Sequence, residues 1–451
     1  MQLTGALGAS RPTPRTLEGW GAEARRWALL AVLIVGAMIP WYTLSLVPLL
    51  TVGTAKVNLL DTLVACAVLL SGPVVVTALR RGEWEILSVF LFLAYMTVAF
   101  ALGLARDPHA RFFAVRESRG LAFYALAAVF AVGGYATRDF HRFAVAYVVG
   151  TVVAVVAVFA HVVWHAPLPG YPAMIASTPS AQADVIARYL EWTVPVVAFT
   201  ICLAGVLSRT PLRTRAAWAV GLCCIVWYLI AMHERTAEGV ALAVAVTLGV
   251  LPSLGGLTWR RVAIMIAMLA FVIGLGVVPG PHWIHYPAER MLGYWGQLAR
   301  DDGSVRVRIN ELESALPRFL QSPVLGQGLG TVVADEPPDF HTGEPWRYIA
   351  PGYGYLLVKT GLIGLVLYLG MVGLALRRAW RYDRAGREAE GWPRWTIATV
   401  GMGALLALNL ADPSVDTAEG AIAFSLFFGM LVAPELNVGA PDRKRWAKGR
   451  R

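Results

Sequence analysis

Apolar spans alternate with short charged connections along nearly the whole chain. A helix that crosses a membrane needs about 20 predominantly apolar residues, and by that measure the pattern predicts about twelve spans. They are Trp27–Leu50, Val57–Leu79, Ile86–Leu104, Leu121–Ala136, Phe140–Trp164, Tyr189–Leu207, Ala216–Met232, Gly239–Leu251, Val262–Val278, Tyr353–Leu376, Trp395–Leu410 and Ala418–Val432. The sequence therefore predicts an all-α, polytopic integral membrane protein.

One long polar segment interrupts this alternation and divides the chain. Hydrophobic residues fill 57% of the 451 positions and charged residues only 15%, which excludes a soluble domain of this length. The predicted parts are a disordered cytoplasmic tail (1–26), spans one to nine (27–279), a large extracytoplasmic loop with amphipathic helices (280–352), spans ten to twelve (353–435) and a basic cytoplasmic tail (436–451).

The basic residues predict which way the chain is oriented in the membrane. Lys and Arg gather in every second connection, for example at Arg80–Arg81, Arg138 and the cluster Arg377–Arg394. Short cytoplasmic loops carry such an excess, so the net charge of +10 is explained without a nucleic-acid partner. We expect a bacterial cytoplasmic membrane location, with both termini cytoplasmic and the long polar loop outside.

Several arginines then fall on the outer face, where membrane insertion does not favour them. A guanidinium group forms paired, charge-assisted hydrogen bonds to phosphate, so an anionic lipid head group or a diphosphate is a natural partner. The alternative is that these arginines bind ordinary phospholipids or pair with nearby carboxylates. The candidates include Arg106, Arg111, Arg116, Arg119, Arg188, Arg235, Arg306 and Arg308, and the carboxylates include Glu117, Glu191 and Glu238.

The long loop contains a helical pattern of its own. Ile309, Leu312, Leu316 and Leu320 recur at helical spacing, which predicts an amphipathic helix able to lie on a membrane surface. The glycine-rich run 326–330 follows. Such a run can hold phosphate at a helix start, but no strand precedes this one, and we expect a tight turn.

These segments resemble the signature of the O-antigen ligase and polymerase family. That signature joins an arginine, an amphipathic helix and a P-x-L-G-x-G-x-G turn to a span that opens e-x-G-L-I-G-L. The matching segments are 304–316 (SVRVRINELESAL), 322–330 (SPVLGQGLG) and 359–365 (KTGLIGL), with Lys359 at a position that is commonly acidic. The entries 184–190 (DVIARYL) and 233–239 (HERTAEG) also match, and the resemblance covers roughly residues 27–435.

The resemblance implies a polyprenyl-diphosphate-linked glycan as donor, used without a metal or another cofactor. By this resemblance Arg188, Arg235 and Arg308 hold the diphosphate, and we expect Arg306 and Arg116 to assist. The acceptor is a lipid-linked saccharide or a lipid A core, and membrane lipids are the other partner. The histidine that many members carry before the G-L-I-G segment is replaced here by Ala350.

The chemistry needs a group that orients or deprotonates the attacking hydroxyl. His341, Glu311 and Asp335 in the loop are the candidates, and His341 titrates nearest to neutrality. His341 can equally be a solvated loop histidine. Asp416 either caps the last span or lines the acceptor site with Asp412 and Glu419, and Asp61 is placed to cap the second span.

We therefore expect a membrane glycosyltransferase of the ligase or polymerase kind, and the sequence does not separate the two. The rival interpretation is a flippase or transporter for a lipid-linked sugar. That class is expected to show internal repeats and charges near the middle of its spans. Here the spans are almost free of charge, which favours the enzyme.

Overall fold

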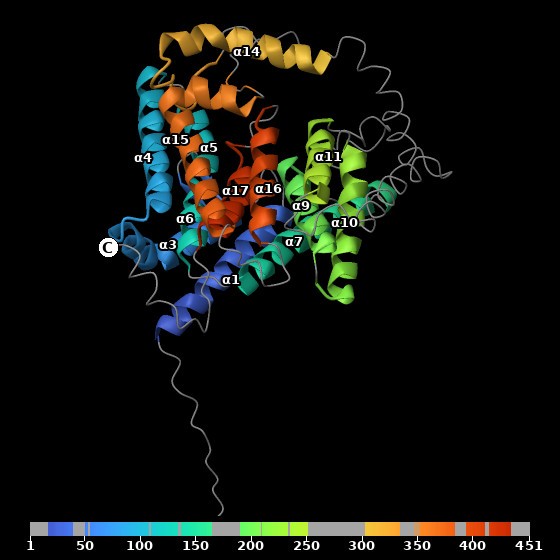
Figure 1. Ribbon diagram of the computed structural model, residues 1–451. Helices are drawn as coiled ribbons and strands as arrows, with labels where there is room; N and C mark the ends of the chain where they lie inside the picture. Colours follow the sequence, from blue (N-terminus) through green and yellow to red (C-terminus); the bar gives the residue numbers. More distant parts are fainter. Residues whose placement is uncertain are drawn as a thin grey trace, which may run out of the picture.

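The computed structural model describes residues 17–38, 50–52, 55–107, 110–133, 137–164, 190–208, 210–232, 235–250, 303–333, 347, 349, 351–383, 394–410 and 415–433. Across these ranges the regular structure is helical, apart from one hairpin of two short strands, and turns such as residues 322–333 connect the helices (Figure 1). The hairpin pairs β1 (Leu50–Val52) with β2 (Ala55–Val57) in antiparallel register.

The helices confirm the predicted all-α class. Five segments are long and apolar enough to cross a membrane, and four shorter apolar helices accompany them in the described part of the chain. In chain order the helices are α1 (Leu17–Met38), α3 (Leu59–Arg80), α4 (Trp84–Arg106), α5 (Arg111–Ala122), α6 (Ala125–Val132), α7 (Thr137–Trp164), α9 (Thr193–Leu207), α10 (Leu212–Met232), α11 (Arg235–Val250), α14 (Gly303–Gln321), α15 (Gly352–Asp383), α16 (Arg394–Leu408) and α17 (Ala418–Val432).

Three of the predicted boundaries are wrong. The first span was predicted to end at Leu50, but α1 ends at Met38 and Leu50 lies in strand β1. The span predicted at Leu121–Ala136 is divided, because α5 and α6 meet at a turn over Phe123 and Tyr124. The helix predicted to begin at Trp27 already begins at Leu17, within the predicted disordered tail. Residues 17–26 are polar, and Glu, Ala and Arg favour helix without raising hydropathy. The predicted ninth span lies outside the described residues.

The interior of the bundle is built around α17. Every residue of α17 is buried, as is every residue of α9. Figure 1 shows α17 among the other helices of the bundle. Small residues bring the helices close together: a Cβ on Gly429 would overlap Phe130 of α6, and one on Gly401 would overlap Phe427 of α17. Such close contacts are how helices associate in a bilayer, where neighbouring lipid is as apolar as a side chain.

Helix α15 is broken at Gly361, whose φ of 66° and ψ of −169° are not helical. A break leaves carbonyl groups of the first half and N–H groups of the second half without helical partners. The turn after α14 supplies those partners. Gln327 N–H donates to the Val358 carbonyl (2.7 Å), and Leu362 N–H donates to the Pro323 carbonyl (2.9 Å). The Tyr95 hydroxyl of α4 donates to the Thr360 carbonyl (2.9 Å).

The glycine-rich run 326–330 is confirmed as a tight turn. Gly326, Gly328 and Gly330 all have positive φ, which favours glycine. All five N–H groups of the run donate to protein acceptors: the carbonyls of Ser322, Val358, Lys359 and Ala99, and the Glu117 carboxylate. The turn therefore has no backbone donor left for phosphate, and its role is to close the break in α15.

We expect Gly361→Ala to destabilise the fold, because a Cβ there would overlap the Val324 carbonyl and φ would stay positive. Backbone strain and overpacking together cost on the order of 2–6 kcal/mol. Gly370→Ala, in the same helix with open space around it, is the matched control and should be neutral or slightly stabilising. The midpoint of thermal unfolding in detergent measures both, and equal midpoints would contradict the account of the break.

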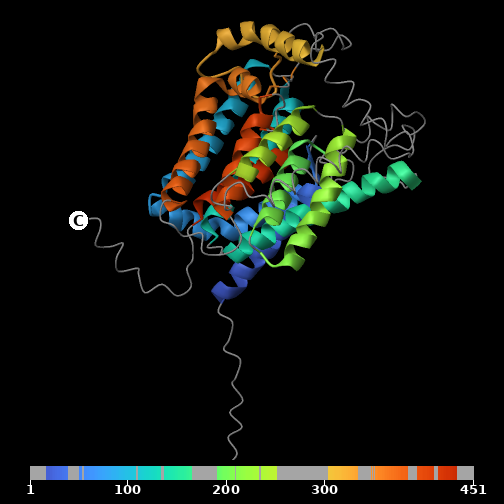
Figure 2. The same ribbon diagram turned by 45° about the vertical axis from the view of Figure 1, so that its right-hand side comes forward.

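The predicted amphipathic segment is helix α14. In both ribbon views α14 lies across one end of the bundle, over α15 and beside the end of α4 (Figures 1 and 2). Ala315 of α14 packs with Val333, Ile349 and Val358 in a small apolar cluster of its own. This end of the molecule also holds the glycine turn and the cavity described next.

Candidate functional site

A cavity of about 310 Å³ lies beside α5, next to the start of α17. It combines three guanidinium groups with two carboxylates and two phenylalanine rings. The residues that line it are Leu60, Phe113, Arg116, Glu117, Arg119, Gly120, Phe123, Arg347, Asp416, Thr417 and Ala418. They come from α3, α5, the loop before α15 and the start of α17, so the cavity exists only in the folded chain.

Close packing of α5 against the start of α17 brings the arginines to the cavity. Gly120 touches the Asp416 backbone, and a Cβ on Gly120 would overlap the Asp416 carbonyl oxygen. Arg116 and Arg119, three residues apart on a helix, therefore lie on the side that faces the cavity. Arg116 is exposed.

The N-terminus of α17 adds to the positive character of the cavity. Thr417 is the N-cap residue, and its hydroxyl accepts the Gly420 N–H (3.0 Å). The first turn of a helix carries a partial positive charge. The prediction that Asp416 caps this helix is wrong, because the residue after it does so; Asp416 lines the cavity instead.

Arg119 is held by Asp61 of α3. Its Nε donates to Asp61 Oδ1 at 2.6 Å. Asp61 is also the third residue of α3 and forms a capping box with Asn58, so it helps to cap the helix, but the N-cap residue itself is Asn58. The alternative considered for the outer arginines, pairing with a carboxylate, is therefore right for Arg119. The pair fixes the guanidinium group at the edge of the cavity.

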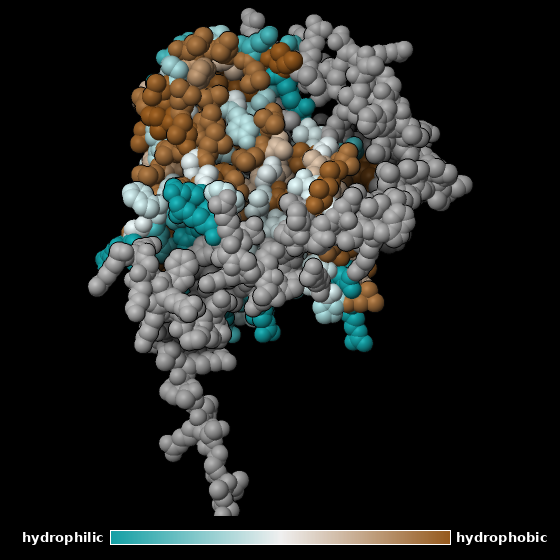
Figure 3. Space-filling model, viewed as in Figure 1, coloured by the Kyte–Doolittle hydropathy of each residue, from teal (hydrophilic) through white to brown (hydrophobic). Residues whose placement is uncertain are grey.

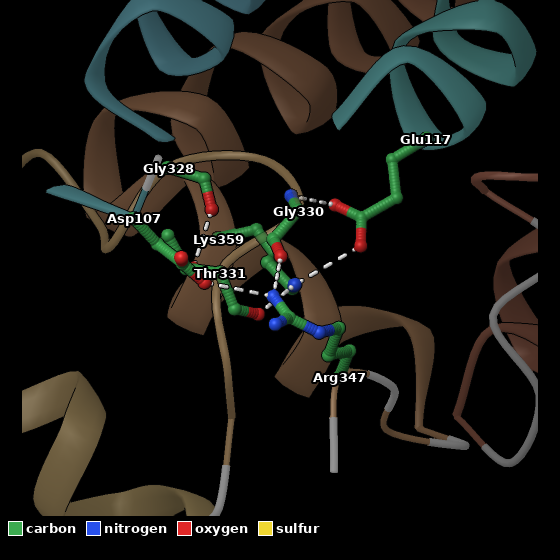
Figure 4. Close-up of polar contacts among 7 residues, drawn as sticks. All are labelled: Asp107, Glu117, Gly328, Gly330, Thr331, Arg347 and Lys359. Atoms are coloured by element: carbon green, nitrogen blue, oxygen red, sulfur yellow. Dashed lines mark hydrogen bonds and ion pairs between the residues drawn. The ribbon is translucent and has the colours of Figure 1, made fainter. Parts of the chain in front are cut away.

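A buried lysine joins Glu117, which lines the cavity, to the backbone that follows the glycine turn (Figure 4). The Lys359 side chain is fully buried, and its Nζ donates to Glu117 Oε1 (3.0 Å) and to the Thr331 carbonyl (2.6 Å). The other oxygen of Glu117 accepts the Gly330 N–H at 2.6 Å. Glu117 thus ties α5 to both α15 and the turn, and we call Lys359, Glu117 and the Gly330–Thr331 backbone the charge clamp.

Arg347 binds the carbonyl group of the same glycine, Gly330. It donates to the Gly330 carbonyl and to Asp107 Oδ2, the latter at 2.9 Å (Figure 4). Its guanidinium carbon lies 4.7 Å from the centre of the Phe113 ring, a cation–π contact. Arg347 therefore takes part in both the turn and the cavity lining.

The structure places only part of the predicted site. Arg116 lines the cavity, Arg308 is half-buried on α14, and Glu311 is buried on α14 and is not among the lining residues. The remaining predictions involve side chains outside the described part of the structure: Arg188, Arg235, Arg306, Asp335, His341 and Asp412.

Three contributors to the site were not singled out from the sequence. Arg119 was simply a member of the outer arginine set, Arg347 was one of the arginines of the long polar loop, and Lys359 was noticed only as a departure from a commonly acidic position. All three are charged residues that lie next to or within a predicted apolar span, and this position is the signal that could have identified them. Glu117, regarded only as a possible arginine partner, pairs with Lys359 instead.

The cavity combines groups for two kinds of ligand chemistry. The guanidinium groups of Arg116, Arg119 and Arg347 and the α17 N-terminus favour an anion such as phosphate. The carboxylates of Glu117 and Asp416 accept hydrogen bonds from hydroxyl groups. A ligand that carries both phosphate and hydroxyl groups satisfies both sets.

No protein-family model matches the chain, and no curated protein matches it. The fold and the cavity define a helical protein whose apolar helices fit a membrane, with an arginine-rich cavity at one end.

Proposed function

We propose that the protein is a membrane glycosyltransferase. It transfers a polyprenyl-diphosphate-linked saccharide to an acceptor sugar on the outer face of the bacterial cytoplasmic membrane, as an O-antigen or exopolysaccharide polymerase or ligase. The observation that carries the proposal is the cavity in which Arg116, Arg119 and Arg347 meet beside the α17 N-terminus. The resemblance in segments 304–316, 322–330 and 359–365 agrees with it.

The orientation required by this proposal follows from the basic residues. Arg80 and Arg81 at the end of α3, and Arg377 and Arg378 near the end of α15, belong to the basic side of the chain, which is expected to be cytoplasmic. Asp61, at the opposite end of α3, binds Arg119 of the cavity. The cavity then opens at the outer face, where a lipid-linked donor presents its saccharide.

The diphosphate would bind at the arginines, with the first sugar near the carboxylates. A cavity of about 310 Å³ is at the small end of ligand pockets, which suits a diphosphate and part of one sugar. Glu117 and Asp416 would accept hydrogen bonds from sugar hydroxyl groups. Phe113 and Phe123 would give the sugar ring an apolar surface. The rest of the glycan would extend out of the cavity.

In the reaction an acceptor hydroxyl oxygen attacks the anomeric carbon, and the bond from that carbon to the diphosphate oxygen breaks. Negative charge gathers on the departing diphosphate, and fixed guanidinium groups stabilise it more strongly in the transition state than in the substrate. The hydroxyl proton passes to a base, for which His341 and Asp335 remain the predicted candidates; Glu311, the third, is buried on α14 and does not line this cavity. Arg188, Arg235, Arg306 and Arg308 remain predicted diphosphate ligands.

The test is an assay of the purified protein with a polyprenyl-diphosphate-linked oligosaccharide, without added metal or nucleotide, and with products identified by mass. A longer lipid-linked glycan together with free polyprenyl diphosphate is expected of a polymerase. Release that depends on an added lipid A core is expected of a ligase. If no polyprenyl diphosphate is released with either acceptor and the intact lipid moves across the liposome membrane, the protein is a transporter and not a glycosyltransferase.

A further inference from the structure

Helix α14 exposes an apolar flank. Ile309, Leu312, Leu316 and Leu320 are all exposed, and Leu320 has 63% of its surface accessible. At about 3.6 residues per turn these four positions fall on one flank of the helix. The polar residues Asn310, Ser314 and Gln321 fall on the opposite flank, and Glu311 and Ala315 are buried between the two flanks, toward the body.

The apolar flank continues onto the outside of the bundle. The turn after α14 exposes Val324 and Leu325. Hydrogen bonds from Leu362 to the Pro323 carbonyl and from Ile363 to the Val324 carbonyl join this turn to α15. Below it α15 exposes Leu362, Val366 and Leu369, and the neighbouring α4 exposes Leu91 and Val98. Figure 3 shows the apolar surface extending over this side of the molecule up to its α14 end.

We propose that α14 lies in the surface of the lipid bilayer, with the flank formed by Ile309, Leu312, Leu316 and Leu320 inserted among the lipids. The occupant is lipid because the flank is continuous with the exposed faces of α4 and α15, two helices long and apolar enough to cross a membrane. The axis of α14 crosses those helices, as expected for an interfacial helix (Figures 1 and 2).

The position of α14 determines how deep in the membrane the cavity lies. The glycine turn follows α14 directly, and its Gly330 peptide is held by Glu117 and Arg347, which both line the cavity. A helix anchored at the lipid–water boundary therefore holds the cavity at the level of lipid phosphate groups. The inference concerns position in the membrane, and it stands whether or not the protein transfers saccharides.

The test uses single nitroxide labels on the full-length protein, with the native cysteines Cys66, Cys202, Cys223 and Cys224 replaced by serine or alanine. Labels at Leu316→Cys and Leu320→Cys report on the apolar flank, and labels at Ser314→Cys and Gln321→Cys on the opposite flank of the same helix are the matched controls. The labelled proteins are placed in vesicles of phosphatidylethanolamine and phosphatidylglycerol. Power-saturation spectroscopy then compares collisions with oxygen, which concentrates in lipid, and with a water-soluble nickel chelate.

We expect the ratio of oxygen to nickel accessibility to be several-fold higher at positions 316 and 320 than at positions 314 and 321. Equal nickel accessibility on both flanks would show that the apolar flank faces water. Labels at 316 and 320 that meet neither reagent would show that protein covers the flank. Either result overturns the proposal, and neither depends on transfer activity.

Discussion

Replacing Arg116 by alanine should lower the rate of saccharide transfer by about 10²–10³, which is the usual loss when one preorganised charge-stabilising contact is removed from a transition state. Arg116 is the exposed arginine of the cavity lining, whereas Arg119 and Arg347 are half-buried. The measurement is the initial rate of polyprenyl diphosphate release by purified protein. Arg116→Lys keeps the charge but loses the planar, two-pronged donor, so its rate should be intermediate.

Arg111→Ala is the matched control for this prediction. Arg111 is exposed on the same helix, α5, but it does not line the cavity. Its loss should leave the transfer rate within a few-fold of the unchanged protein. The midpoint of thermal unfolding confirms that each variant is folded. If the Arg116→Ala protein is folded and keeps the full rate, the diphosphate does not bind in this cavity. Equal losses of rate in both variants would point to a general effect of surface charge.

Hydropathy predicts the apolar segments well but does not predict where a helix breaks. The predicted last span coincides with α17, and the predicted second and third spans fall within two residues of α3 and α4. The break at Gly361 follows Lys359 and Thr360 inside a predicted span, and the break at Phe123–Tyr124 lies in an apolar run; the mean hydropathy of a span reveals neither break. Each break is maintained by partners from distant segments, such as the turn that closes α15, and a single sequence does not contain that information.

The candidate site could also be predicted only in part from the sequence. Residue chemistry directed attention to the outer arginines, and the predicted phosphate ligand Arg116 lines the cavity; its binding of phosphate stays a prediction. Choosing between Asp416 and Thr417 as the helix cap was harder, because Asp and Thr are both favoured N-cap residues. Ion pairs across the fold are harder still: Lys359 and Glu117 lie 242 positions apart, and only the packing of α15 against the turn and α5 brings them together.

Replacing Lys359 by methionine should destabilise the protein by about 3–5 kcal/mol, the usual cost when one partner of a buried ion pair is removed. Lys359 is fully buried, and the Glu117 side chain is only 11% exposed. The variant leaves the Glu117 charge away from water with only the Gly330 N–H of the charge clamp as its remaining donor, and it leaves the Thr331 carbonyl without the Lys359 ammonium. The measurement is the midpoint of thermal or denaturant-induced unfolding in detergent.

Two comparison variants separate the effect of the uncompensated Glu117 charge from the effect of losing the Lys359 side chain. Arg378→Met removes another cation of α15, whose pair with Glu85 of α4 is partly solvated, with each side chain 18% exposed, so its cost should be smaller. Lys359→Met combined with Glu117→Gln removes both charges, while the glutamine oxygen can still accept the Gly330 N–H. That double variant should regain much of the stability lost in Lys359→Met. If it is no more stable than the single variant, the uncompensated charge of Glu117 is not what destabilises the protein. The contribution of Lys359 would then lie in its packing and in its bond to Thr331.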